Sequence, residues 1–254
     1  MTNFRKLIDN INAKTLSFQK NKDIFSKKEF EKNRSIIWKI IGKIFPEYRN
    51  YPFHNLTKFK NLEEKEIDFL NKIKKINGMS TLTNALLINK LCESIGKKNY
   101  VNIGCWEGFS LISGMINTSC NVYGVDNFSQ FNGPSKKFYQ NFNKFKKKNH
   151  FFFEMDYKDF FSNHWKKENK KIDLYFYDGN HSYNDQLESL EIAKPYFQKG
   201  SIIIVDDTNI DDVKNATKKF LINNQNEFEI LMDINTSSNG HFTFWNGLII
   251  FFKK

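Results

Sequence analysis

Cysteine and proline are scarce in this sequence of 254 residues, and long apolar runs are missing from it. The 3 cysteines, Cys92, Cys105 and Cys120, show no C-x-x-C spacing. Such an odd and sparse set argues against a disulfide scaffold or a thiolate zinc site, and it favours a reducing compartment. The first residues lack the apolar stretch of a signal peptide, and no run approaches the ~18 apolar residues of a membrane span. We therefore expect a cytoplasmic protein without a membrane segment.

Acidic residues are outnumbered by basic ones, which gives a formal net charge of +11. A basic chain is compatible with a nucleic-acid or anionic-membrane partner. The lysines are nevertheless spread along the whole chain, and Asn, Ile and Phe are also plentiful. Composition bias is thus the favoured explanation, and a nucleic-acid partner is the weaker one.

Residues 1–77 have the features of a helical N-terminal extension. Apolar side chains recur at helical spacing over residues 30–44, which predicts one helix. A second helix is predicted over Leu62–Ile76, with Asn61 as its N-cap and Asn77-Gly78 as its end. Two roles stay open for this extension, namely a cover over a substrate site or a contact between copies in a homo-oligomer.

From residue 78 to residue 254, short apolar runs alternate with amphipathic segments. The predicted strands are Tyr100–Ile103, Val122–Val125, Phe151–Met155, Leu174–Tyr177, Ile202–Val205, Phe228–Ile234 and Leu248–Phe252. The predicted helices are Leu82–Ile95, Phe109–Ile116, Ser135–Lys147, Tyr183–Phe197 and Asp211–Asn224. Nearly continuous apolar runs are typical of parallel strands buried on both faces, so the pattern predicts a doubly wound α/β domain. A turn signal at Ser237–Gly240, with no helix between the last two strands, predicts an antiparallel end.

Ligands of open α/β sheets bind beyond the carboxyl ends of the strands, so the residues after each strand carry the functional signal. Gly104 and Gly108 follow the first strand and let the backbone approach a ligand before a helix begins. Their G-x-x-x-G spacing differs from the G-x-G-x-x-G of dinucleotide sites, and alone it equally fits an ordinary tight turn. Asp126 follows the second strand at the spacing of an acid that accepts from ribose hydroxyls.

After the third strand, Asp156 and Tyr157 offer a carboxylate for an adenine amino group and a ring to stack on it. The alternative for Asp156 is a helix cap. After the fourth and fifth strands come Asp178 and the pair Asp206-Asp207.

Three carboxylates at the ends of adjacent buried strands are costly unless a cation or hydrogen bonds compensate them. Oxygen ligands suit Mg²⁺, Mn²⁺ or Ca²⁺. His181, three residues after Asp178, has the ordinary pKa of a general base at neutral pH. The alternative is that Asp207 and His181 are loop and capping residues.

These segments together resemble class I S-adenosylmethionine-dependent methyltransferases. More narrowly, they resemble the small-molecule O-methyltransferases with a D-G-x-H-x-Y segment, which include macrolide-sugar and caffeoyl-CoA-type enzymes. Cephalosporin-hydroxylase-like proteins share the fold and a similar ending of the fifth strand. The matching segments are NIGCWEGFS, VYGVDNFS, FFFEMDYKDF, YFYDGNHSYNDQLESLEIAKPYFQKGSIIIVDD and NGLIIFF. The resemblance begins at about residue 80, and its specific part runs from Tyr175 to Asp207.

The resemblance implies a mostly parallel, seven-stranded, Rossmann-like sheet that binds S-adenosylmethionine and methylates a hydroxyl of a small molecule. The implied cofactor contacts are Asn102, Gly104, Glu107, Gly108, Asp126, Asp156, Tyr157 and Asp178. It further implies that Asp178, Asp206 and Asp207 hold Mg²⁺ or Mn²⁺, and that His181 and Asp178 are catalytic, with His181 as the base. Asn102 departs from the family, which usually has Glu or Asp there.

Three other functions are compatible with parts of the sequence. A nucleic-acid methyltransferase is suggested by the charge, but base-amino methylases usually carry an Asn/Asp-Pro-Pro-aromatic segment where this chain has YDGNHSY. A cofactor-binding scaffold without turnover is suggested by Asn102. A nicotinamide oxidoreductase is disfavoured by the missing third glycine.

Overall fold

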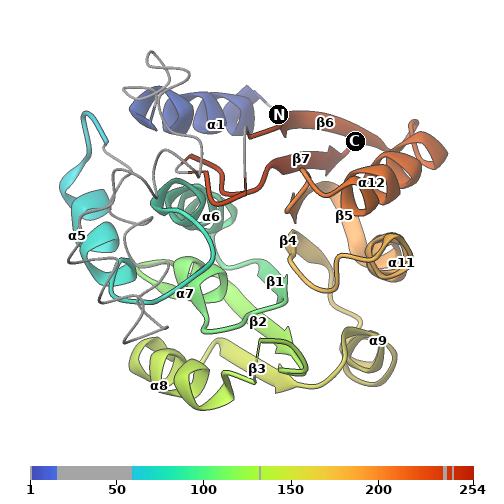
Figure 1. The fold of residues 1–254 in the computed structure, drawn as a ribbon, viewed down its shortest axis with the longest axis horizontal. Helices are drawn as coiled ribbons and strands as arrows, with labels where there is room; N and C mark the ends of the chain where they lie inside the picture. The colour runs from blue at the N-terminus through green and yellow to red at the C-terminus, as the bar shows by residue number, and fades with distance from the viewer. Residues whose placement is uncertain (1, 16–58, 132, 237–238, 242) are drawn as a thin grey trace.

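The protein is a single twisted sheet with helices on both faces, seen in a computed structural model that describes residues 2–15, 59–131, 133–236, 239–241 and 243–254 (Figure 1). The strands are β1 (Asn99–Ile103), β2 (Asn121–Asp126), β3 (His150–Glu154), β4 (Ile172–Tyr177), β5 (Phe197–Asp206), β6 (Phe228–Ile234) and β7 (Leu248–Lys253). The longer helices are α1 (Thr2–Thr15), α5 (Glu64–Ile73), α6 (Leu82–Ile95), α7 (Phe109–Met115), α8 (Ser135–Phe145), α11 (Tyr183–Ala193) and α12 (Asp211–Asn223).

The strand order is β3-β2-β1-β4-β5-β7-β6. Pairing is parallel from β3 to β5, whereas β7 runs antiparallel to both β5 and β6. This confirms the predicted doubly wound, mostly parallel sheet of seven strands with an antiparallel end. The chain order reverses between β1 and β4, and the crevice above such a switch point is where open α/β sheets bind ligands.

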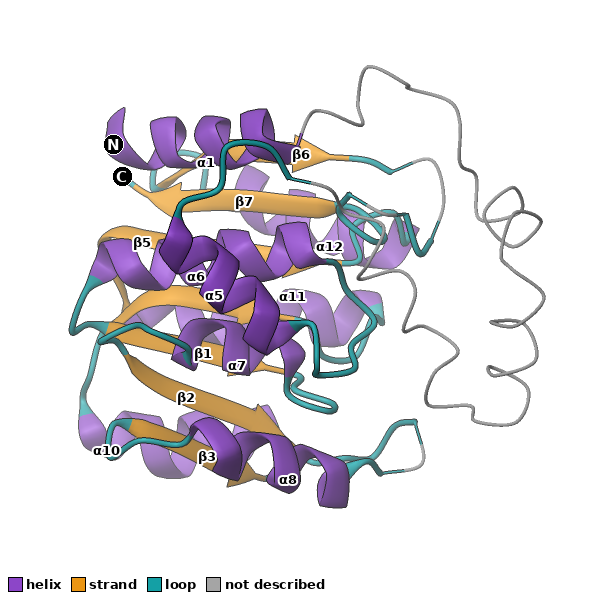
Figure 2. Ribbon diagram, turned by 90° about the vertical axis from the view of Figure 1, so that its left-hand side faces the viewer, coloured by secondary structure: helices purple, strands orange, loops and turns teal. Residues whose placement is uncertain are grey.

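Both faces of the sheet are buried, as the apolar runs predicted. Along β5, Ile202 and Ile204 belong to one apolar cluster, while Ile203 and Val205 belong to the other. Alternate side chains of a strand point to opposite faces, so a strand covered on both sides must be apolar throughout. The first cluster lies under α6 and α7, and the second lies under α11 and α12 (Figure 2).

The described parts of the N-terminal extension pack on the first of these layers. Ile8 and Ile11 of α1 join the apolar cluster that contains α6. The carboxylate of Glu66 in α5 is buried and accepts from the ammonium groups of Lys14, at 2.8 Å, and Lys90, at 3.2 Å. A buried carboxylate requires such partners, so this ion-pair network fastens α1 and α5 to α6.

The predicted cap of α5 was wrong. Glu63, not Asn61, is the N-cap, and the backbone N–H of Glu63 donates to the side chain of Glu66 in a capping box. Asn61 instead adopts a left-handed backbone with φ of 55°. The helix also ends at Ile73 rather than Ile76, ahead of Asn77-Gly78.

Two further boundaries differ from the prediction. The helix expected to reach Phe197 ends at Ala193, and β5 begins at Phe197 after a 3-10 turn (Lys194–Tyr196). Between β3 and β4 the chain forms the short helices α9 (Tyr157–Asp159) and α10 (Lys166–Glu168) around a π-helical turn (Phe160–Trp165). That turn buries Phe160, Phe161 and Trp165 together, a spacing that a search for regular helical periodicity does not detect.

The helix predicted over residues 30–44 lies outside the described residues. No described helix combines the length and apolar character needed to cross a membrane.

Candidate active site

A cavity of about 590 Å³ opens at the carboxyl ends of β1 to β5. Its walls are the loops that follow these strands, together with the segment between β6 and β7. Both its position and its volume are those of a small-molecule site in an open α/β fold.

Gly104 begins the loop after β1 and lines this cavity. Its backbone N–H donates to the carbonyl of Val125 at 2.9 Å, and its φ is 80°. A Cβ built at Gly104 would lie 1.8 Å from the carbonyl oxygen of Asp178. The residue is therefore glycine because the loops after β1 and β4 come into direct contact there, in addition to any room it leaves for a ligand.

Asp126, at the end of β2, holds this loop in place and lines the cavity. One carboxylate oxygen accepts from the backbone N–H groups of Cys105 and Trp106, at 2.7 and 2.8 Å. The other accepts from the N–H of Phe128, at 2.7 Å. Sequence reasoning assigned Asp126 to a ribose and missed these three bonds. Contact of Asp126 with a ribose stays a prediction. The lone pairs of its carboxylate that these three bonds leave unused would accept from the ribose hydroxyls.

Three other predicted contacts lie behind the cavity wall. Asn102 is fully buried; its amide donates to the carbonyl of Gly104 at 2.9 Å and accepts from the hydroxyl of Tyr100. Glu107 is buried and accepts from the side chain of Asn77. Gly108 caps α7 in a left-handed conformation. The loop after β1 is thus supported on its buried side by Asn102, Glu107 and Gly108. The described residues that line the cavity do not include these three.

Asp156 and Tyr157 line the opposite wall. Asp156 caps α9 by accepting from the N–H of Lys158 at 2.9 Å, so the capping alternative holds for it. The Tyr157 hydroxyl donates to the carbonyl of Asp185, and burial raises the pKa of this phenol far above neutrality. Both side chains remain candidates for the adenine.

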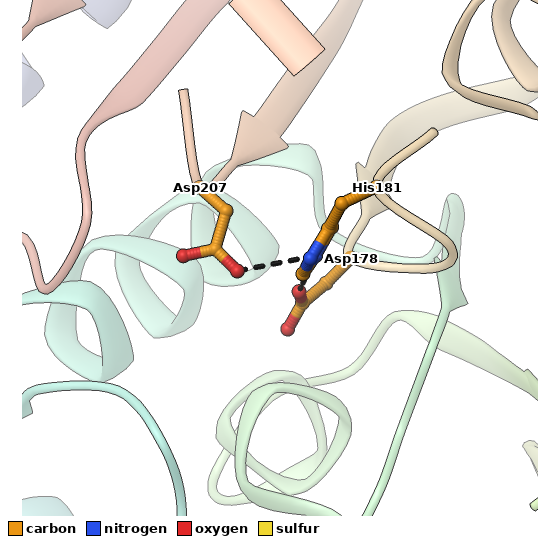
Figure 3. Close-up of side chains that lie close together, drawn as sticks. All are labelled: Asp178, His181 and Asp207. Carbon is orange, nitrogen blue, oxygen red and sulfur yellow. Dashed lines mark ion pairs between the residues drawn. The ribbon is translucent and has the colours of Figure 1, made fainter. Parts of the chain in front are cut away.

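The charged part of the cavity brings Asp178, His181 and Asp207 together (Figure 3). The Nε2 atom of His181 lies 3.1 Å from Oδ2 of Asp207 and 3.5 Å from Oδ1 of Asp178. Asp207 directly follows β5 with a left-handed backbone, φ 56°. The loops after β4 and β5 therefore place one imidazole between two carboxylates.

These three groups shift one another's protonation. Burial raises the pKa of Asp178, and His181 opposes this rise. Burial and the charge of Asp178 raise the pKa of Asp207 to about 6, against the effects of His181 and Asn246. Burial lowers the pKa of His181, but its hydrogen bond to Asp178 and the charges of Asp178 and Asp207 outweigh burial and leave the pKa raised.

Asp206 stands apart from this group, although it was predicted as a metal ligand with Asp178 and Asp207. It is the last residue of β5, is 4% exposed, and accepts from the N–H of Asp207 at 3.0 Å. Burial, followed by the charges of Asp178 and Asp207, raises its pKa well above the ordinary value. The ligand atoms that lie within 4.8 Å of one another belong to Asp178, His181 and Asp207.

Sequence reasoning missed the aromatic part of the wall. Eight non-glycine residues of the described chain have positive φ, and three of them are asparagines, which tolerate it. The other five are Trp106, Phe128, Phe131, Asp207 and Trp245, and all five line the cavity. Bulky residues in this conformation store strain, which is typical of functional sites. Sequence patterns carry no signal for them, because these residue types normally avoid this conformation.

The segment between β6 and β7 closes one side of the cavity with Trp245 and Asn246. Asn209 holds it, since the Asn209 backbone N–H donates to the carbonyl of Asn246 at 2.8 Å and its amide donates to the carbonyl of Thr236 at 2.7 Å. The side chain of Asn246 also bonds to Asp207. This segment therefore helps to fix the charged group.

Part of the chain matches a known family. Residues 101–208 match a family described as a methyltransferase domain. No curated protein sequence matches the chain significantly.

Solved structures share the fold at low sequence identity. An O-methyltransferase from Bacillus cereus in complex with SAH is 13% identical, and the match covers 88% of this chain and 99% of that one with a TM-score of 0.57. The O-methyltransferase TomG from Streptomyces achromogenes is 10% identical over 81% of this chain and 96% of that one, TM-score 0.54. A putative caffeoyl-CoA O-methyltransferase from Staphylococcus aureus is 16% identical over 82% and 99%, TM-score 0.54. Residues 101–208 thus match a methyltransferase domain, and the sheet shares the fold of these solved structures.

Proposed function

We propose that the protein transfers the methyl group of S-adenosylmethionine to a hydroxyl of a small molecule. The observation that carries the proposal is one cavity that joins the Gly104 loop and Asp126 to an imidazole held between two carboxylates. The Gly104 loop and Asp126 provide the close backbone approach and the carboxylate that a nucleoside cofactor requires. The imidazole provides the base that a hydroxyl nucleophile requires.

The donor would lie along the loops after β1, β2 and β3. Gly104 keeps the loop close to the sheet, Asp126 fixes the loop and offers remaining lone pairs to the ribose, and Asp156 and Tyr157 lie where the adenine is expected. Because three backbone N–H groups already position Asp126, this side of the site is organised before the ligand binds. Such preorganisation lowers the entropic cost of binding.

In the reaction, the hydroxyl oxygen forms a bond to the methyl carbon while the bond from carbon to sulfur breaks. The sulfonium becomes a neutral thioether, and the hydroxyl proton must be accepted. His181 is the proposed acceptor of this proton. Its Nε2 faces Asp178 and Asp207, which would hold the N–H there and stabilise the imidazolium, so the proton would be taken at Nδ1. The remaining task of the protein is alignment of oxygen, carbon and sulfur, which is chiefly positioning.

The same group has the donors of a divalent cation site. Two carboxylate oxygens and one imidazole nitrogen lie within 4.8 Å of one another. Carboxylates suit Mg²⁺ and Mn²⁺, whereas imidazole suits softer ions. A bound cation, held by Asp178 and Asp207, would lower the pKa of the acceptor hydroxyl. Such a cation would also relieve the cost of charging these two carboxyl groups, whose pKa values burial raises.

Methyl transfer can be tested before the acceptor is known. The protein is incubated with trideuteromethyl-labelled S-adenosylmethionine and a small-molecule cell extract, and products are analysed by mass spectrometry. We expect a compound that carries the labelled methyl group in place of a hydroxyl hydrogen, together with an equal amount of S-adenosylhomocysteine. Label found on an amine, a carbon or a nucleic-acid base would contradict the proposed reaction.

A further inference from the structure

The charge of the cavity is opposite to that of the chain. The whole protein has a formal net charge of +11. Among the described residues that line the cavity there is no Lys, Arg or Glu, and the only basic side chain is His181. The acidic lining residues are Asp126, Asp156, Asp178, Asp185 and Asp207. An acidic cavity in a basic protein selects ligands by charge.

Few cationic side chains of the described chain lie against these carboxylates. Asp126 and Asp156 are compensated by backbone N–H groups, which are dipoles rather than full charges. Asp185 has an ammonium partner in the half-exposed Lys158, at 3.6 Å. His181 carries at most one positive charge between Asp178 and Asp207.

This charge suits the proposed donor. S-adenosylmethionine has a sulfonium and an ammonium against one carboxylate and is a net cation, whereas S-adenosylhomocysteine lacks the sulfonium charge. A negative cavity attracts the first more than the second. The same field disfavours a phosphate or carboxylate on the acceptor, because sites for such groups supply Arg, Lys or helix N-termini.

The apolar part of the wall points to the same class of acceptor. The rings of Trp106 and Phe131 meet edge to face at 6.4 Å between centroids, and Phe131 is 58% exposed. Trp245 contributes a third ring to the lining. Aromatic faces bind apolar rings and organic cations.

We propose that the methyl acceptor is a neutral or cationic hydroxyl compound with an apolar face, free of phosphate and carboxylate groups. The proposal rests on the proposed function and narrows it. It disfavours nucleic acids and coenzyme A thioesters as acceptors, because their phosphates would enter a cavity whose described lining offers carboxylates and no Lys or Arg.

The first test separates acceptors by charge. A small-molecule cell extract is divided on an anion exchanger at pH 8 before reaction, and each fraction is incubated with the protein and methyl-labelled S-adenosylmethionine. We expect label in compounds that the exchanger does not retain. Label confined to the retained, anionic fraction would overturn the acceptor class and leave the methyl transfer intact. Failure of S-adenosylmethionine to bind at all would instead contradict the proposed function.

The second test measures the field without an acceptor. Calorimetry compares S-adenosylmethionine with S-adenosylhomocysteine at low and high salt. We expect the methylated form to bind about tenfold tighter at low salt, with a preference that shrinks as salt screens the charges. Asp185→Asn, which removes charge from the lining at constant shape, should reduce this preference. Asp212→Asn, an exposed residue of α12 that does not line the cavity, should leave it unchanged. Equal affinity of the two forms in the unmodified protein at low salt would overturn the proposal.

Discussion

The two sides of the cavity satisfy their polar groups in different ways. On the side of β1 and β2, the carboxylate of Asp126 accepts three backbone N–H groups, and the amide of Asn102 is bonded within its own loop. On the side of β4 and β5, Asp178, His181 and Asp207 rely on one another, and the pKa of each is raised. The first side is built as a rigid binding surface. On the second side, two buried carboxylates lie close together, and a bound proton or cation would relieve the cost of their charges.

Breaking the contact between the two sides should have the largest effect. Gly104→Ala would push a Cβ against the carbonyl of Asp178 at 1.8 Å and strain a backbone with φ of 80°. We expect the free energy of unfolding to fall by at least about 3 kcal/mol, with loss of cofactor binding. Denaturant unfolding and calorimetry measure these effects.

Gly96→Ala is the matched control, because Gly96 also has positive φ but nothing lies within 4 Å of the position that a Cβ would take there. That variant should lose only about 1–3 kcal/mol from backbone strain, because no atom would collide with its Cβ. Equal stability of the two variants would show that the two loops do not depend on this contact.

Removing the base should affect the second side alone. His181→Ala is expected to lower the rate of methyl transfer by about 10²–10⁴-fold, the usual contribution of a general base, with little change in cofactor affinity. Single-turnover kinetics and calorimetry separate the two quantities. His164→Ala, at an exposed site, is the control. A rate within about fivefold of the unmodified protein would remove His181 from the mechanism.

Chelation tests whether a divalent cation bound to Asp178 and Asp207 takes part in the reaction. If a divalent ion polarises the acceptor hydroxyl, excess chelator should lower the rate by about 10² or more, because a Lewis acid contributes several kcal/mol. Mg²⁺ or Mn²⁺ should restore the rate, and Zn²⁺ should do so poorly. Full activity in excess chelator would leave the carboxylates to act on His181 without a metal.

Loss of Asp126 should lower the affinity for the cofactor and leave the proton transfer to His181 unchanged. Asp126→Ala deletes the acceptor of three loop N–H groups, so we expect S-adenosylmethionine affinity to fall by roughly 2–4 kcal/mol. Asp126→Asn should cost less, because it keeps one acceptor oxygen. An unchanged dissociation constant in the alanine variant would show that neither the loop nor the ribose depends on this carboxylate.

The smallest effect should be a shift in pH dependence. The base must be neutral, so the rate falls as the pH drops through the pKa of His181, which lies above its ordinary value. Asp207→Asn removes a negative charge at 3.1 Å, which lowers the pKa of the imidazole and moves the acid limb to lower pH. Asp178, His181 and Asp207 titrate together, so the profile reports the group. An acid limb that stays in place or moves upward would show that Asp207 does not stabilise the imidazolium.

The sheet could be predicted because buried parallel strands leave a plain signal. Runs such as Leu174–Tyr177 and Ile202–Val205 are apolar on both faces, and the structure places both as adjacent strands in the sheet. Since the carboxyl ends of these strands meet at one edge, the residues after them could be assigned to one site. Asp178, His181 and Asp207 do lie together there.

The details that sequence could not supply depend on backbone conformation. Asp206 and Asp207 are neighbours in sequence, but the left-handed turn at Asp207 carries only that carboxylate to His181. Asp126 is turned toward its own loop rather than being free for a ligand. The aromatic wall around Trp106 and Trp245 likewise depends on φ values that these residue types rarely adopt.

Calorimetric titration of the unmodified protein with S-adenosylmethionine, S-adenosylhomocysteine and NAD tests the central claim most directly. We propose a nucleoside site at the Gly104 loop, beside which Asp126 is fixed, and the loop lacks the third glycine of a dinucleotide site. We predict that both adenosyl compounds bind with micromolar dissociation constants, which corresponds to about −8 kcal/mol, and that NAD does not bind. Binding of NAD without binding of either adenosyl compound would contradict the account.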